Sequence, residues 1–210
     1  MTIFPNAGAL SRAQRLVLAA LAGAATVPGF APLYLFPVPV ITLALLIILW
    51  QRAGSRRDAA LVGLVFGLGY FLVGVSWVYV SLHDFGAMPA LLAAFLTLLF
   101  CAILALYPAI TGWFYQAFGT RSTLVTLAAL PALWTLTEWL RGWVFTGFPW
   151  IALGYAQVPR SPLAGYVPIL GVYAASFATV LSAGLLVTLW THWRDEQAKP
   201  AHPSSFFLHP

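Results

Sequence analysis

Residues 133–157 read LWTLTEWLRGWVFTGFPWIALGYAQ and set two charged side chains inside an apolar run. The run predicts a helix that carries Glu138 and Arg141 and then breaks at residues 147–149, Gly-Phe-Pro. Side chains three residues apart share one face of a helix, so each charge can partly neutralise the other where hydrocarbon would make either alone costly. The pattern predicts a functional site. The alternative is that Arg141 only reaches towards lipid headgroups, with Glu138 as its partner.

The composition is that of an integral membrane protein. Hydrophobic residues make up 61% of the 210 residues and charged residues 7%, and the mean hydropathy is +0.90. Soluble domains carry about 25% charged residues. Because each membrane helix needs roughly 20 apolar residues, about six spans fit the chain. We predict an all-α, polytopic bundle of about six transmembrane helices with interfacial segments on its outer face, which the resemblance given below implies is periplasmic.

The predicted spans form one transmembrane domain over residues 1–193. They lie near residues 13–29, 33–50, 59–80, 90–114, 124–145 and 163–193. Gly63, Gly67 and Gly74 recur at helical spacing in the third span and predict that a neighbouring helix approaches closely. Residues 194–210 are polar and proline-bearing, which predicts a disordered cytoplasmic tail.

The basic residues indicate topology rather than nucleic-acid binding. The net charge is +5, but the arginines lie at the ends of apolar runs and not on one polar face. Eight of the ten Lys and Arg residues fall in alternate loops and two in the opposite ones, which predicts that both termini are cytoplasmic. The aromatic segments 77–89 and 143–155 then share the outer face.

Three further predictions concern local chemistry. Residues 146–162 are too polar and too broken to cross again, so we predict an interfacial segment that holds Phe148, Trp150 and Tyr155 at headgroup depth. His83 and Asp84 could do acid–base work in a loop, but hydrogen bonding within that loop is the more common role of such a pair. The single cysteine, Cys101, is predicted to be a small buried hydrophobe, and one cysteine allows neither an internal disulfide nor a thiolate metal cluster.

Three motifs carry a family resemblance. They are GFAPLYLFPVPVI at 29–41, SWVYVSLHDFGAMP at 76–89 and TEWLRGWVFTGFPWIALGYAQVPRSPLAGYVPILGVY at 137–173. Over about Arg12 to Trp193 the chain closely resembles the membrane portion of bacterial apolipoprotein N-acyltransferase. Ala87 and Ala156 stand where family members often carry glycine and serine, and neither departure threatens the resemblance.

The resemblance implies an enzyme of the bacterial inner membrane that completes lipoprotein maturation. Members transfer an acyl chain from a phospholipid to the N-terminal cysteine of a diacylglyceryl apolipoprotein, through a thioester on a Glu-Lys-Cys triad in a nitrilase-like periplasmic domain; such a covalent intermediate divides one hard transfer into two easier steps. Members continue past the sixth span into that domain, whereas this sequence stops at Pro210. We therefore expect a truncated, inactive chain with no catalytic residue of its own and no metal or cofactor. No oligomeric state is predicted.

The membrane part is then expected to hold lipid. We predict that the route for acyl chains is lined by Trp77, Tyr79, His83, Glu138, Arg141, Trp143, Phe148, Trp150 and Tyr155. Arg141 is the candidate for binding a phosphate or a carboxylate, because its guanidinium can bind either with two hydrogen bonds. Three alternatives stay open: these residues only anchor the helices, the chain is a non-enzymatic lipid-binding scaffold, or it is a small transporter.

Overall fold

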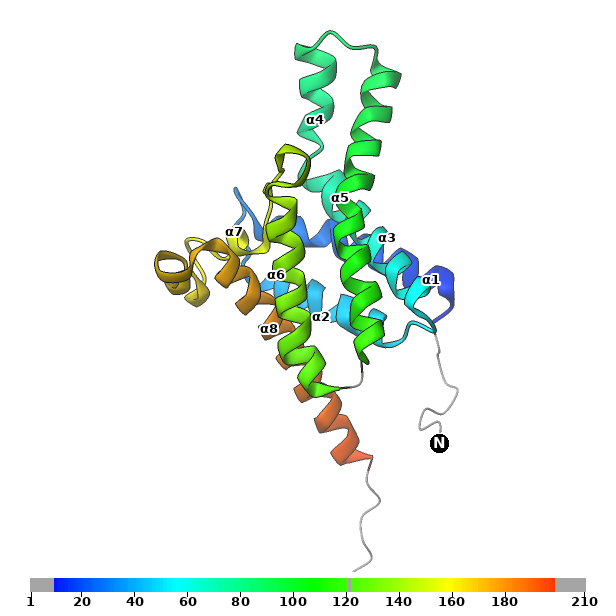
Figure 1. The fold of residues 1–210 in the computed structure, drawn as a ribbon, viewed down its shortest axis with the longest axis vertical. Helices are drawn as coiled ribbons and strands as arrows, with labels where there is room; N and C mark the ends of the chain where they lie inside the picture. The colour runs from blue at the N-terminus through cyan, green and yellow to red at the C-terminus, as the bar shows by residue number, and fades with distance from the viewer. Residues whose placement is uncertain (1–9, 121, 199–210) are drawn as a thin grey trace, which may run out of the picture.

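The computed structural model describes residues 10–120 and 122–198, and every regular element in these ranges is helical (Figure 1). The elements are α1 Arg12–Thr26, η1 Val27–Gly29, α2 Pro37–Gln51, α3 Arg56–Gly74, α4 Trp77–Val80, η2 Ser81–Phe85, α5 Ala90–Phe118, η3 Val125–Ala129, α6 Leu130–Arg141, η4 Val144–Thr146, α7 Leu153–Gln157, η5 Pro162–Tyr166 and α8 Val167–Gln197. Here η2 and η3 are π-helical turns, and the other η elements are 3₁₀ turns.

Helix α3 packs against α5 through its small residues. A Cβ atom added at Gly67 would lie 2.8 Å from the Cα of Ala105, and one at Gly63 would overlap the carbonyl of Pro108. At Gly74 an added Cβ would meet the side chain of Ile151. The predicted close approach of a neighbouring helix is confirmed at Gly63 and Gly67, where only a hydrogen atom fits between the two backbones, whereas the nearest neighbour of Gly74 is the side chain of a loop residue.

Buried aromatic rings join the helices into one core. The ring of Trp50 on α2 lies 5.9 Å from Tyr115 on α5 and 6.4 Å from Trp134 on α6, and Phe66 on α3 lies 6.4 Å from Trp134. The indole nitrogen of Trp50 donates to the carbonyl of Ala59 at 3.0 Å. Such a partner lets a tryptophan be buried without an unsatisfied polar group.

The long helices have the character of membrane spans. Helices α3, α5 and α8 are long and apolar enough to cross a bilayer, and α2 is a shorter apolar helix. Helix α1 has 15 residues and begins at a capping box in which Ser11 accepts from the backbone of Gln14 and Gln14 from that of Ser11. The all-α membrane class is thus confirmed at this level, and the count of six spans stays a prediction.

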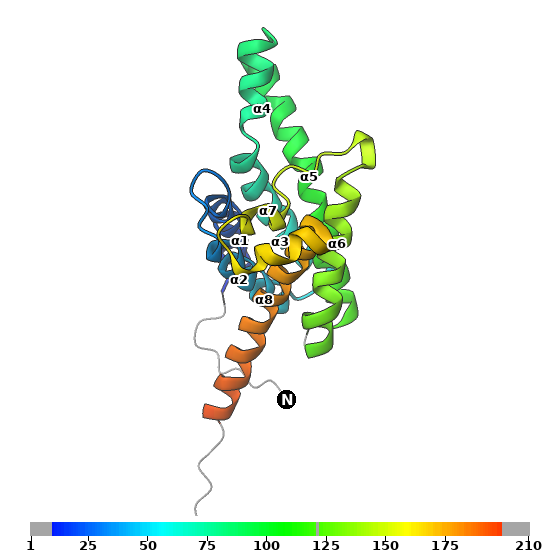
Figure 2. The same cartoon turned by 90° about the vertical axis from the view of Figure 1, so that its left-hand side faces the viewer.

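One helical arm projects from the body of the molecule. Helix α3 ends at Gly74, and the last part of the predicted third span forms the separate helix α4, Trp77–Val80. The residues after Val80, predicted as a loop, form the π-helical turn η2 up to Phe85. With the first turns of α5 it extends beyond the other helices at one end of the long axis, while the end of α8 extends at the other (Figures 1 and 2). Phe85 is 85% exposed on this arm.

The last helix extends further than the sequence suggests. Helix α8 contains Gly171 at φ +75°, which marks a kink, and continues to Gln197, four residues past the predicted end of the span at Trp193. Residues 199–210, most of the predicted tail, lie outside the described residues.

Candidate functional site

The site is built around the loop that follows α6 and returns into the bundle. Arg141, at the end of α6, is only 2% exposed. Its Nη1 donates to the carbonyl oxygens of Phe148 at 2.8 Å and Trp150 at 2.7 Å, and the amide of Phe148 donates to the carbonyl of Arg141 at 2.7 Å. The guanidinium lies over the ring of Phe71, 5.2 Å from its centroid. Arg141 thus ties the loop to the helix from which it leaves.

Glu138 binds the same loop further along the chain, at Leu153. It is 5% exposed, and its Oε1 accepts hydrogen bonds from the amide of Leu153 at 2.9 Å and from the indole of Trp134 at 3.1 Å. Its Oε2 accepts none from the described residues. A buried carboxylate oxygen without a partner is costly in a protein interior, which is typical of a site with a role beyond packing.

The expected ion pair between Glu138 and Arg141 is not present. Among the described residues, ion pairs within 4.0 Å involve Asp58 and Asp84, not Glu138. Both side chains instead bind backbone groups of the loop. The physical reason is that amides and carbonyls of a buried loop need partners, and charged groups form the strongest hydrogen bonds to them.

Most of residues 151–157 are buried in the protein, Tyr155 being exposed, and the interfacial depth of this stretch stays a prediction. Leu153 and Gln157 are fully buried, and Tyr70 donates from its hydroxyl to the carbonyl of Ile151 at 2.6 Å. Ser176 on α8 accepts from the amide of Gly154 at 2.8 Å. Because these partners satisfy its backbone, an irregular segment is tolerated within a membrane bundle.

The loop backbone is strained. Phe145, Thr146 and Ile151 have positive φ angles of 53°, 73° and 49°, and Gly147 has φ +82°. A left-handed backbone conformation is uncommon for residues other than glycine, and it is rare for β-branched residues such as threonine and isoleucine. Such strain persists only where surrounding contacts impose it, and it is concentrated at functional sites.

Aromatic rings from three parts of the chain meet beside this loop. The ring of Trp77 lies 5.4 Å from Trp150 and 6.4 Å from Phe148, and Phe100 on α5 lies 4.9 Å from Phe148. We call these four residues the aromatic cluster. Trp77 is 43% exposed and Trp150 53% exposed. The expected meeting of the two outer segments is therefore observed at Trp77.

The other predicted residues lie apart from the aromatic cluster. On the arm, the ring of Tyr79 lies 5.4 Å from that of His83, and Nδ1 of His83 is 2.8 Å from the carbonyl oxygen of Met88. Nε2 of His83 lies 3.9 Å from a carboxylate oxygen of Asp84, as expected for a pair that interacts locally within the arm. Trp143 packs on Trp139 at 5.1 Å, and Tyr155 is exposed on α7; neither has a ring contact with the cluster.

Sequence reasoning missed four residues of the site: Tyr70, Phe71, Phe100 and Ser176. Each lies in an apolar helix with no local feature to mark it. Trp134 was detectable, because it precedes Glu138 by one helical turn and can reach its carboxylate.

A small cavity lies beside the charged residues. Its volume is about 10 Å³, and it is lined by Tyr70, Phe71, Tyr107, Pro108, Trp134, Thr137, Glu138 and Arg141. A space of this size admits about one water molecule. An acyl chain or a lipid phosphate does not fit in this space, and the hydrogen bonds of Glu138 and Arg141 among the described residues run to the loop and to Trp134.

Fold and site together define the class: an all-α membrane protein with a strained loop held by buried charges at one end of its bundle. Residues 22–185 match the family described as apolipoprotein N-acyltransferase N-terminal domain. The chain belongs to this family.

Relatives named apolipoprotein N-acyltransferase match most of the chain. The protein of Nitrosomonas europaea is 52% identical over 82% of this chain and 35% of its own length. The protein of Vibrio vulnificus is 46% identical over 87% of this chain and 36% of its own length. The protein of Methylococcus capsulatus is 45% identical over 84% of this chain and 35% of its own length. The chain therefore spans about a third of the length of these relatives.

Proposed function

We propose that this chain is the membrane part of an apolipoprotein N-acyltransferase of the bacterial inner membrane, with both termini in the cytoplasm. The reaction would move an acyl chain from a phospholipid to the N-terminal cysteine of a diacylglyceryl apolipoprotein. The family match and the names of the relatives support this assignment. Cys101 is fully buried in α5 and so is not available as the nucleophile, which the relatives would carry outside the matched region.

The aromatic cluster is the proposed lipid contact. The observation that carries this proposal is the pairing of two exposed tryptophans, Trp77 and Trp150, beside a strained and pinned loop. Amphipathic rings favour the boundary between hydrocarbon and headgroups, where a donor phospholipid and a lipidated acceptor would both be presented. Because the loop is held by hydrogen bonds, Trp150 is placed before lipid arrives and little ordering cost remains.

Glu138 and Arg141 are proposed as positioning residues. They bind the backbone at Phe148, Trp150 and Leu153, so they determine where the ring of Trp150 lies. Tyr79, His83, Trp143 and Tyr155 lie outside the aromatic cluster and are proposed to flank it as membrane-interface anchors.

A chimaeric enzyme tests the proposal. The matched region of the Nitrosomonas europaea relative is replaced by residues 22–185 of this chain. N-acylation of a reporter lipoprotein is then measured by mass spectrometry in cells depleted of their own enzyme. The chimaera is expected to acylate the reporter, and Trp150→Ala to lower the rate by about tenfold, the size of effect typical of a central tryptophan contact.

The control is Trp113→Ala. Trp113 is also an exposed tryptophan, but it packs on Arg56 at the other end of α3. Its replacement is expected to leave acylation unchanged. Equal acylation by the parent chimaera and by the Trp77→Ala and Trp150→Ala variants, at equal membrane levels, would show that the rings only anchor helices.

A further inference from the structure

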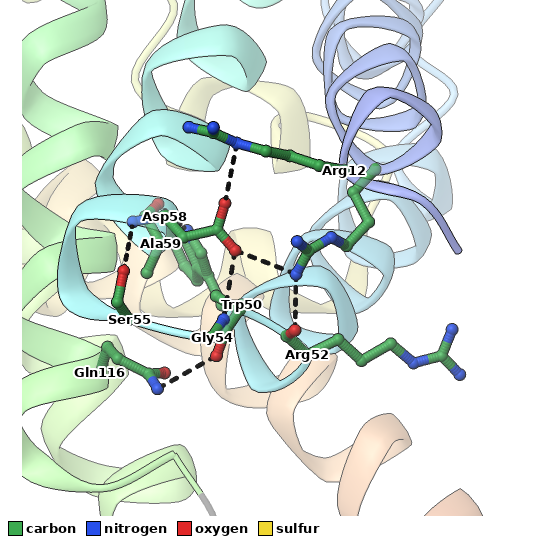
Figure 3. Close-up of polar contacts among 10 residues, drawn as sticks. Arg12, Trp50, Arg52, Gly54, Ser55, Asp58, Ala59 and Gln116 are labelled. Atoms are coloured by element: carbon green, nitrogen blue, oxygen red, sulfur yellow. Dashed lines mark hydrogen bonds and ion pairs between the residues drawn. The ribbon is translucent and has the colours of Figure 1, made fainter. Parts of the chain in front are cut away.

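A second polar cluster, drawn in Figure 3, surrounds Asp58 in the first turn of α3. The loop site contacts the other end of this helix, at Phe71. Asp58, in the first turn of α3, lies 3.0 Å from Nη1 of Arg15 and 3.6 Å from Nε of Arg12, both on α1. Arg15 also donates to the carbonyl of Arg52 at 2.6 Å, and Asp58 accepts from the amide of Gly54 at 3.2 Å. These contacts fix the loop between α2 and α3 against α1.

The cluster borders an open pocket of about 360 Å³. Its lining consists of Arg12, Arg15, Gly54, Ser55, Arg57 and Asp58. Three guanidinium groups and one carboxylate give the lining a net charge of +2, three positive minus one negative. The volume lies within the range of ligand pockets, roughly 300–1,000 Å³.

The positive charge of this pocket is not fully compensated within the described residues. Asp58 is shared between two arginines. The side chain of Arg57 makes no hydrogen bond or ion pair with any described residue. The Nε of Arg12 lies 3.6 Å from Asp58, a longer contact than that of Arg15, and the Arg12 side chain is mostly exposed. Arg12 and Arg57 therefore keep donors free for a ligand, which must be anionic.

The position of the pocket indicates where that anion comes from. It lies where α1 begins at Arg12, α2 ends at Gln51 and α3 begins at Arg56. Val17 and Leu21, further along α1 than Arg12, are exposed apolar side chains of the kind that contact hydrocarbon. A charged pocket at the end of an exposed apolar surface lies at the depth of lipid phosphates.

We propose that this pocket binds the phosphate-bearing headgroup of an anionic phospholipid. Guanidinium groups bind phosphate oxygens with paired hydrogen bonds, and basic pockets between membrane helices favour lipids with a net negative charge. Bound lipid would tie α1 to the α2–α3 loop. This site is separate from the aromatic cluster and does not depend on the proposed acyltransferase function.

The test uses the purified full chain in mild detergent. Native mass spectrometry counts retained phosphatidylglycerol or phosphatidylcholine, each added at the same concentration. Phosphatidylglycerol is expected to be retained in preference, and Arg57→Gln to weaken its retention by about fivefold, the effect of removing one arginine near an anionic headgroup. Arg57→Lys keeps the charge but loses the planar guanidinium group, so we expect its retention of phosphatidylglycerol to lie between that of the parent chain and that of Arg57→Gln.

Arg52→Gln is the matched control. It removes the same charge five residues earlier, in the loop before α3, but Arg52 does not line the pocket and its side chain extends away from Asp58 (Figure 3). It is expected to leave lipid retention unchanged. Equal losses in Arg52→Gln and Arg57→Gln would show general surface attraction and overturn the proposal, as would equal retention of the two lipids. Displacement of phosphatidylglycerol by millimolar inorganic phosphate would assign the pocket to free phosphate instead.

Discussion

The two ends of α3 use charged side chains in opposite ways. At the Arg56 end, Asp58 forms ion pairs with Arg12 and Arg15 beside an open pocket. At the Gly74 end, Glu138 and Arg141 approach the helix from α6 and bind backbone groups of the loop, not each other. The difference goes with the degree of burial: Arg12 is 67% exposed and Arg15 and Asp58 are partly buried beside an open pocket, where charges can pair with each other and with water. Glu138 and Arg141 are almost fully buried and satisfy a backbone that has no water to bind.

Arg141→Met should give the largest loss of stability. The change keeps an unbranched apolar stem but leaves the carbonyls of Phe148 and Trp150 without a donor, so we expect a loss of about 3 kcal/mol or more. The free energy of unfolding would be measured in detergent by SDS titration followed by tryptophan fluorescence. Arg57→Met, at the other end of α3, is the control and should change it by less than about 0.5 kcal/mol. Equal losses would contradict the comparison.

Gly147→Ala should have the next largest effect. An alanine there must adopt φ +82°, and its Cβ would overlap the carbonyl of Gly142 and lie 2.8 Å from the Cα of Trp143. The backbone alone costs about 1–2 kcal/mol, and the overlap adds to it. Gly119→Ala is the matched control, because Gly119 has φ +98° and open space around it. A Gly147 variant no less stable than the Gly119 variant would show that the loop is not held tightly.

Tyr70→Phe removes one pinning contact without changing shape. The carbonyl of Ile151 then loses its hydroxyl donor at 2.6 Å, and we expect about 1–2 kcal/mol of destabilisation. Hydrogen exchange of the amides near Ile151 should accelerate more than exchange along α1. Tyr79→Phe is the control, because the Tyr79 hydroxyl has no hydrogen-bond partner among the described residues. Unchanged exchange near Ile151 would remove Tyr70 from the site.

Asp58→Asn should have the smallest effect and the strongest salt dependence. It removes the charge that faces Arg12 and Arg15 but keeps an oxygen for the amide of Gly54, so we expect about 1 kcal/mol or less at low salt. At 1 M salt the screening length is about 3 Å and the effect should largely vanish. The effect of Arg141→Met should persist in the same buffer. If Asp58→Asn lowered the stability equally at low and high salt, the contacts of Asp58 would behave like the buried contacts of Arg141, and the comparison would fail.

Much of the architecture follows from local properties of the chain. Long apolar runs predict helices, and the glycine spacing at Gly63 and Gly67 predicts the contact with α5, because small residues at helical spacing permit close approach whatever the partner is. The position of Glu138 and Arg141 in an apolar run also marked them as candidate site residues. Burying a charge is costly in any fold, so its position in the sequence already carries information.

The roles of these residues could not be predicted in the same way. A spacing of three residues predicts that Glu138 and Arg141 share a helix face, but it does not show that the loop returns close enough to take both as partners. The helical turn at Ser81–Phe85 was missed because its aromatic and polar residues are equally typical of an interfacial loop.

The sequence by itself determined that this is an all-helical membrane protein, which helix faces are small enough to pack, and that residues 133–157 place two charges in an apolar run. Only the tertiary structure decided that the charged side chains bind the loop backbone, that Tyr70 and Ser176 complete its support, and that Trp77 meets Trp150. The physical reason is that helix formation and hydrophobicity are properties of neighbouring residues, whereas hydrogen-bond partners are selected among groups that packing brings together from distant parts of the chain.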